Sequence, residues 1–197
     1  MSDETATLPE PPGVSLEDID RMLVATPAIL WAELQGMSQP LMRWRPAPGA
    51  WCALEIVGHL IETDLRAFST RIVQVRNEPG ATFDGFDPVA VARRRDDREA
   101  DPQALVDEFA RVRKVGVGLV RELTAADLAL GGIDPDVGGL TIANLLAAWV
   151  AHDRAHLAQV GLIVRAAMLA GMGNSRAFGH AVEAARWQAG HLAAPEA

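Results

Sequence analysis

Four long stretches of the sequence carry apolar residues at intervals of three and four, which is the spacing of one face of an α-helix. They span about residues 15–36, 53–77, 102–123 and 141–170, and a further helix is expected at about 175–191. We find no segment of useful length in which apolar and polar residues alternate as in a half-buried strand. The sequence therefore predicts an all-α fold, an antiparallel four-helix bundle with an extra C-terminal helix.

The predicted helices begin at residues that favour helix starts. Ser15 is followed three residues later by Asp18, a short-armed capping box, and Asp101 precedes a proline. Thr141 opens the long fourth helix, and Cys52 stands where an N-cap serine or threonine is usual. These signals place the helix starts within a few residues.

The segments between and beyond the helices divide the chain. Residues 1–14 are acidic and rich in proline, and we expect them to be a disordered tail. Residues 15–171 form the bundle, and residues 172–197 form a C-terminal helical extension. Residues 78–100, with their mixed charge run, are expected to be a solvated loop with at most one short helical turn.

Composition excludes several classes of partner. Lysine and arginine number 18 against 26 acidic residues, a net charge of −8, so no nucleic acid and no anionic membrane is expected as a partner. The longest apolar run is interrupted by two histidines, Asp153 and Arg154, which argues against a membrane span. A single cysteine, Cys52, and the lack of a signal peptide favour a cytoplasmic protein.

Three of the histidines are the candidate metal-binding residues. His152 and His156 lie four residues apart in "AWVAHDRAHLAQV", so both side chains fall on one helix face. His59, in the apolar "EIVGHLIET", offers a third imidazole on another helix, and bundle metal sites are built from such facing side chains. Glu62, one turn on, could orient a ligand or act as a base, and Gln159 could contact a ligand at the rim. Spacing alone leaves a packed core as an equal alternative.

Two motifs together resemble the DinB-like (DinB/YfiT) superfamily. The first is the Pro-x-Pro-Gly-x-Trp segment at 46–51, followed by a helix with His59 and Glu62. The second is the Thr141-led helix, with His-Asp-x-x-His-x-x-Gln at 152–159. The resemblance covers about residues 15–165, with a cysteine where the family usually shows serine and a C-terminal helix beyond the shared region.

The resemblance implies a site and a chemistry. It implies a four-helix bundle in which His59, His152 and His156 hold a divalent metal ion, zinc or nickel foremost and iron or another metal as alternatives. Several relatives use low-molecular-weight thiols, which implies a thiol-dependent S-transferase that acts on a small electrophilic substrate. An apolar bundle face with tryptophans could support a homodimer.

Other functions remain open at this point. An open three-histidine site could equally serve a metal-dependent hydrolase, with Glu62 as the base. A non-catalytic, stress-related bundle that binds a metal or a small ligand is a second possibility. A structural or oligomerisation module with core histidines is a third.

Overall fold

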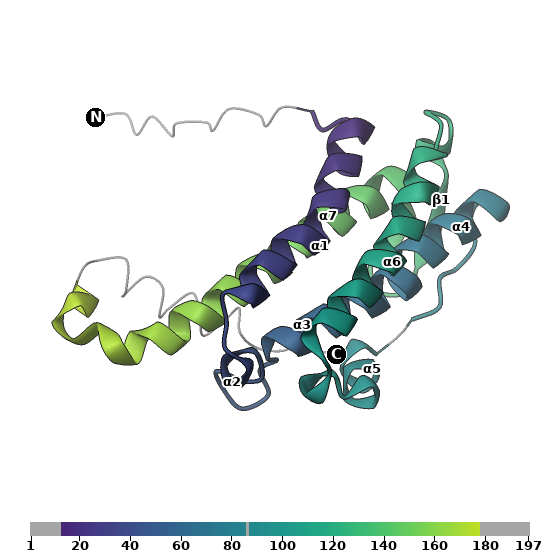
Figure 1. Ribbon diagram of the computed structural model, residues 1–197. Coiled ribbons are helices and arrows are strands. Elements are labelled where there is room, and N and C mark those ends of the chain that lie inside the picture. Colours follow the sequence, from purple (N-terminus) through teal and green to yellow (C-terminus); the bar gives the residue numbers. More distant parts are fainter. Residues whose placement is uncertain (1–12, 86, 178–197) are drawn as a thin grey trace, which may run out of the picture.

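The computed structural model describes residues 13–85 and 87–177. Four long helical members pack side by side as a bundle (Figure 1), as the sequence predicts. In chain order they are α1 (Leu16–Gln35), the run α3 (Ala53–Thr63), η1 (Asp64–Ser69) and α4 (Thr70–Asn77), then α6 (Pro102–Arg121), and α7 (Ile142–Met168). The second member is one continuous helical run, in which η1 is a π-helical insertion. Such wider turns are rare and are often found at functional sites.

The helix starts are confirmed at their capping residues. Ser15 accepts a hydrogen bond from the Asp18 backbone N–H, and the Asp18 carboxylate accepts one from the Ser15 N–H, which completes the predicted capping box. Asp101 and Thr141 cap α6 and α7 in the same way: each has an extended backbone, and its side chain accepts a hydrogen bond from a backbone N–H three residues later. At Cys52 the backbone N–H donates to the Glu55 carboxylate at 2.9 Å.

The connection at 78–100 contains more helix than the sequence led us to expect. It holds α5 (Pro88–Arg95) and the 3-10 turn η2 (Asp97–Glu99). Asp87 accepts hydrogen bonds from the N–H groups of the first turn of α5, and Pro88 stands at its start. The expectation of a solvated charge run was wrong for Arg95, whose side chain is only 18% exposed and pairs with three carboxylates.

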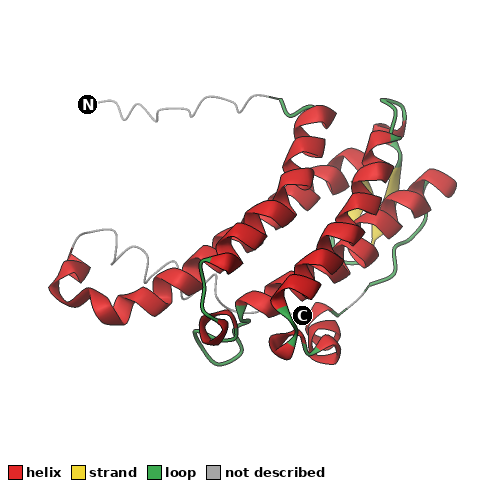
Figure 2. Ribbon diagram, viewed as in Figure 1, coloured by secondary structure: helices red, strands yellow, loops and turns green. Residues whose placement is uncertain are grey.

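The expectation of no strands was also wrong. The glycine-rich stretch forms a small hairpin of β1 (Gly131–Asp134) and β2 (Gly138–Thr141), drawn as yellow arrows in Figure 2. Phe83 N–H donates to the Ile133 carbonyl at 2.8 Å, so the segment after α4 lies along the hairpin. At Gly132 a Cβ atom would lie 2.6 Å from the Phe83 ring, which explains why glycine is required at that position.

A buried ion network holds the four bundle members together. Arg113 of α6 donates to both oxygens of Asp64 from η1 and to Asp153 of α7, and its side chain is 2% exposed. Trp149 Nε1–H donates to Asp64 at 2.7 Å, and the Thr26 hydroxyl of α1 donates to Asp153 at 2.6 Å. We call these five residues the Arg113 network. Each of its side-chain donors and acceptors has a partner, as a buried charged group requires.

The C-terminal end of the described chain continues α7. The 3-10 segment η4 (Leu169–Ala177) follows it and extends beyond the bundle (Figure 1). The predicted N-terminal tail, up to residue 12, and the predicted helix at 175–191, from residue 178 on, lie outside the described residues. Among the described residues, the helical run Ile142–Ala177 is the one long and apolar enough to cross a membrane. That run carries the buried Asp153 and packs on α1 and α3, as a bundle core helix does.

Candidate metal centre

The structure brings together the three histidines that the sequence singled out. His59 lies on α3, and His152 and His156 lie one turn apart on α7. The Nε2 atoms of His59 and His152 are 3.0 Å apart, and one ring nitrogen from each of the three falls within 4.8 Å of the others. The ring centroids are 4.4–5.0 Å apart. The three imidazoles therefore form one cluster, contributed by two helices that face each other.

The donor set fits a divalent metal ion. Two nitrogens bound to one ion at about 2.0–2.1 Å, with an angle of about 90–109° at the ion, lie about 2.8–3.4 Å apart. The 3.0 Å between the Nε2 atoms of His59 and His152 falls in this range. The other ring nitrogen of His152, Nδ1, is buried without a hydrogen-bond partner.

The imidazoles are neutral, which is the form that binds metal. Burial, with the neighbouring imidazoles adding to its effect, lowers the pKa of His59 to about 2. Burial likewise lowers the pKa of His152 to about 3 and lowers that of His156. No proton has to leave the folded site before a metal ion can bind at neutral pH.

Ring packing and one amide fix the orientation of the histidines. Gln159 Oε1 accepts a hydrogen bond from His156 Nδ1 at 2.8 Å, which leaves the lone pair on Nε2. The Trp51 ring lies 4.6 Å from that of His59 and 6.3 Å from that of His156, and the Phe68 ring lies 5.5 Å from that of His152. Gln159 was expected at the rim as a ligand contact. It is buried beside His156, in the position of a group that orients a ligand.

Glu62 is directed away from this cluster. Its two carboxylate oxygens accept hydrogen bonds from Arg66 at 2.6 Å and from Arg95 at 3.0 Å. Burial would raise the pKa of Glu62, but these two guanidinium groups outweigh it and lower the pKa. A carboxylate held in this way is a poor base, so the ion pairs argue against the catalytic role expected for Glu62.

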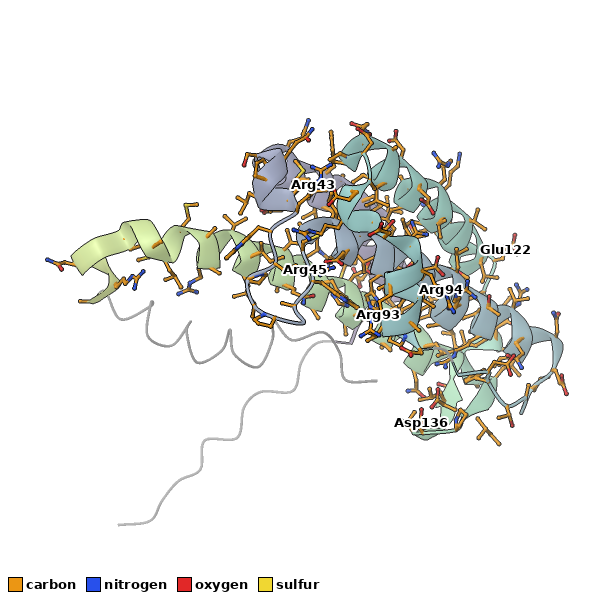
Figure 3. The ribbon with its side chains drawn as sticks, turned by 90° about the horizontal axis from the view of Figure 1, so that it is seen from below. Arg43, Arg45, Arg93, Arg94, Glu122 and Asp136 are labelled. Atoms are coloured by element: carbon orange, nitrogen blue, oxygen red, sulfur yellow. The ribbon has the colours of Figure 1, made fainter. Side chains whose placement is uncertain are left out.

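A cavity of about 660 Å³ opens on the histidines, and we call it the histidine cavity. That volume lies in the usual range for small-molecule sites. Apolar side chains that include Phe68 and Leu162 form much of its wall. Pro135 and Asp136, from the hairpin turn, line it as well, and Figure 3 shows Asp136 at the outer edge of the molecule.

The wall of the histidine cavity also carries an arginine that sequence reasoning missed. Arg71 of α4 pairs with Asp134 of β1 at 3.1 Å, and its guanidinium lies over the Phe83 ring at 4.9 Å. Its Nε atom is buried and has no hydrogen-bond partner. One signal was present in the sequence: Arg71 follows Phe68 by three residues, so both fall on one helix face.

Cys52 is not a reactive thiol. It is fully buried, and burial raises the pKa of its thiol to about 11. A thiol with that pKa stays protonated at neutral pH and is a weak nucleophile. His180 and His191, which have no partner at ligand spacing in the sequence, lie outside the described residues.

Comparisons with known proteins agree with this fold. A family model described as the DinB superfamily matches residues 22–160. Among solved structures, the chain is similar to YfiT from Bacillus subtilis, described as a probable metal-dependent hydrolase with an unusual four-helix bundle topology. That match has a TM-score of 0.71 and 21% sequence identity, and it covers 82% of this chain and 94% of YfiT. No curated protein matches the sequence significantly.

Proposed function

This chain belongs to the DinB superfamily, and we propose that it is a metal-dependent enzyme in which His59, His152 and His156 hold one divalent ion, zinc or nickel in the first place. The observation that carries the proposal is the convergence of three neutral imidazoles in the wall of a cavity that can hold a small molecule. Three protein ligands leave a position for substrate, as in catalytic rather than structural sites. A divalent ion there supplies Lewis acidity, which lowers the pKa of a coordinated thiol or water.

The residues around the histidines serve to hold and shield them. Gln159 fixes the ring of His156 by accepting from Nδ1–H, so that Nε2 faces the cluster. Trp51 and Phe68 pack against the rings and keep bulk water from their far sides. The mainly apolar cavity wall holds the substrate body next to the histidines.

We propose thiol-dependent S-transfer to a small electrophile as the reaction. The thiol loses its proton to solvent, its sulfur forms a bond to the electrophilic carbon, and the leaving group departs with the electron pair. This reaction requires no protein base once the thiol is acidic. That requirement agrees with a site in which Glu62 and Asp134 are both engaged in ion pairs with arginines.

Hydrolysis of a small molecule is the second candidate. It is favoured by the similarity in fold to YfiT, which is described as a probable metal-dependent hydrolase. In hydrolysis, water replaces the thiol as the nucleophile, and a base must take its proton. The two candidates differ in whether product formation depends on an added thiol.

Metal analysis of the purified protein tests the site. We expect about one equivalent of zinc or nickel in the wild-type protein and a large loss of metal in His59→Ala. His180→Ala is the matched control, because it changes a histidine to which the sequence assigns no ligand role. Unchanged metal content in His59→Ala would contradict the site.

Turnover assays then test the reaction. The metal-loaded protein is mixed with 1-chloro-2,4-dinitrobenzene and a set of small thiols, and separately with 4-nitrophenyl acetate. Thiol-dependent product that is lost in His59→Ala supports S-transfer, whereas thiol-independent ester cleavage supports hydrolysis. No turnover in either assay with full metal occupancy would favour a non-catalytic binding protein.

A further inference from the structure

Arg71 differs from two other arginines of this chain that are also largely buried. The side chains of Arg71, Arg95 and Arg113 are 16%, 18% and 2% exposed. Arg95 pairs with three carboxylates, those of Glu62, Asp97 and Glu108. Arg113 pairs with two, those of Asp64 and Asp153. Arg71 pairs with one, Asp134, through a terminal nitrogen.

The Nε–H of Arg71 is the part of the guanidinium left without a partner. This atom is buried, so water does not satisfy it, and a buried donor without an acceptor is costly. In Arg95 and Arg113 the corresponding Nε–H donates to a carboxylate at 2.7 Å. The guanidinium of Arg71 therefore has fewer carboxylate partners than those of Arg95 and Arg113.

The side chain of Arg71 also belongs to the wall of the histidine cavity. Arg71 lines the cavity together with the three histidines, and it follows His59 by twelve residues on the same helical run. Twelve residues of helix correspond to about 18 Å between the two Cα atoms. Ala67 and Phe68 line the wall between them, so the cavity has a histidine end, an apolar middle and an arginine end.

We propose that Arg71 binds a carboxylate of the substrate, so that the histidine cavity takes small organic carboxylates with an apolar body. The carboxylate accepts hydrogen bonds from the guanidinium, which can pair with two carboxylates at once, as Arg113 does. The apolar body lies along Ala67 and Phe68. The assignment of the reacting end to the histidines rests on the function proposed above; the binding of the carboxylate by Arg71 does not.

Two carboxylates in the cavity wall, Asp134 and Asp136, oppose the binding of an anion, and Asp134 already pairs with Arg71. Asp136 lines the cavity from the hairpin turn and is exposed to water. Solvent screens its effect on Arg71 more strongly than it would screen a buried charge. The buried guanidinium is therefore expected to dominate the choice of ligand.

The test compares two probes of the same shape in the full chain freed of metal by a chelator. The probes are 4-phenylbutyrate and its neutral primary amide, 4-phenylbutyramide, and their binding is measured by calorimetry. We expect the wild-type protein to bind the carboxylate about tenfold more tightly than the amide. Arg71→Gln should bind the two equally within about twofold. Arg66→Gln, on the same helical run but outside the cavity wall, should keep the preference.

Equal or absent binding of the two probes by the wild-type protein would overturn the proposal. So would a preference that survives in Arg71→Gln. Because Arg71→Gln leaves Asp134 without its partner, the double variant Arg71→Gln/Asp134→Asn is measured too, with circular dichroism to confirm folding. It should show the same loss of preference.

The same experiment on zinc-loaded protein separates this proposal from the function proposed above. If the histidines bind no metal, the carboxylate preference of the metal-free protein is still expected and still depends on Arg71. If a preference appears only with zinc and survives in Arg71→Gln, the metal ion binds the carboxylate. That outcome would support the metal site and overturn the role of Arg71.

Discussion

The Arg113 network and the histidine cavity are two polar regions of one bundle, and they meet on α7, where Asp153 follows His152 directly. In the first, each charged group is paired, and Arg113 bridges two carboxylates. In the second, His152 Nδ1 and Arg71 Nε are buried without partners. In this bundle, the buried polar groups that join helices satisfy one another's hydrogen bonds, whereas some of those that line the cavity have no partner.

The difference has an energetic meaning. A completed buried network costs little once formed, but it becomes very unfavourable when a single member is removed. An incomplete one costs stability in the free protein, and a ligand that supplies the missing partners recovers that cost. Mutations in the Arg113 network should therefore lower the free energy of unfolding, and ligands of the histidine cavity should raise it.

Removal of the central cation should give the largest effect. Arg113→Met leaves Asp64 and Asp153 buried together without a counter-charge, and we expect unfolding free energy to fall by about 3–5 kcal/mol. Urea unfolding measures the loss. Lys114→Met is the matched control, because Lys114 is the exposed neighbour on α6 and its replacement should change stability by less than about 0.5 kcal/mol. A loss below about 1 kcal/mol in Arg113→Met would mean that the network contributes little.

Metal should stabilise the second region by a comparable amount. Zinc at about one thousand times its dissociation constant is expected to raise the free energy of unfolding by about 4 kcal/mol, since the unfolded chain lacks the site. His59→Ala should lose this gain, whereas Arg113→Met, although less stable, should keep it. Thermal melts with and without zinc measure the effect. An equal zinc-dependent gain in His59→Ala would contradict the site.

The two regions should also respond to pH in opposite directions. The pKa of His152 is lowered to about 3 in the folded chain, against about 6.5 in the unfolded chain, so below pH 6.5 the unfolded state binds more protons and stability falls. Burial, with the Asp153 carboxylate adding to it, raises the pKa of Asp64 to about 6 against the effect of Arg113. The folded state therefore gains this proton first, and Asp64 adds stability as pH falls through 6.

His152→Leu isolates the histidine contribution. Between pH 7 and pH 5, His152 should cost the metal-free wild-type protein about 2 kcal/mol of unfolding free energy, which the variant should not lose. Urea unfolding of both proteins at several pH values, in the presence of a chelator, gives the two slopes. Parallel slopes would show that His152 titrates in the folded chain with the same pKa as in the unfolded chain.

The sequence predicted the parts of this comparison that depend on local pattern. Helical periodicity placed His152 and His156 on one face and offered His59 on another helix, and the resemblance to a known family implied that the three act together. Glu62 shows the limit of spacing. It lies one turn from His59, but Arg66 and Arg95 draw its carboxylate away from the cluster.

The parts that the sequence did not predict depend on distant segments. Helix α5 was not predicted, because its charge run was interpreted as solvated. The partners of Arg95 come from three separate elements, which the local sequence does not show. The hairpin was not predicted, because its strands are four residues long and rich in glycine. Arg71 became a candidate only once Asp134 of that hairpin was placed beside it.

The smallest expected effect concerns the exposed carboxylate at the cavity rim. Asp136→Asn removes an exposed charge that opposes an anion near Arg71, and the metal-free protein should then bind 4-phenylbutyrate about twofold more tightly. Binding of 4-phenylbutyramide should not change, because it carries no charge. The gain should shrink as salt rises from about 0.01 to 0.15 M, since the screening length falls from about 30 to 8 Å. A large, salt-independent gain would instead show that Asp136 contacts the ligand directly. The carboxylate of Asp136 would then affect the binding of the ligand as strongly as the guanidinium of Arg71.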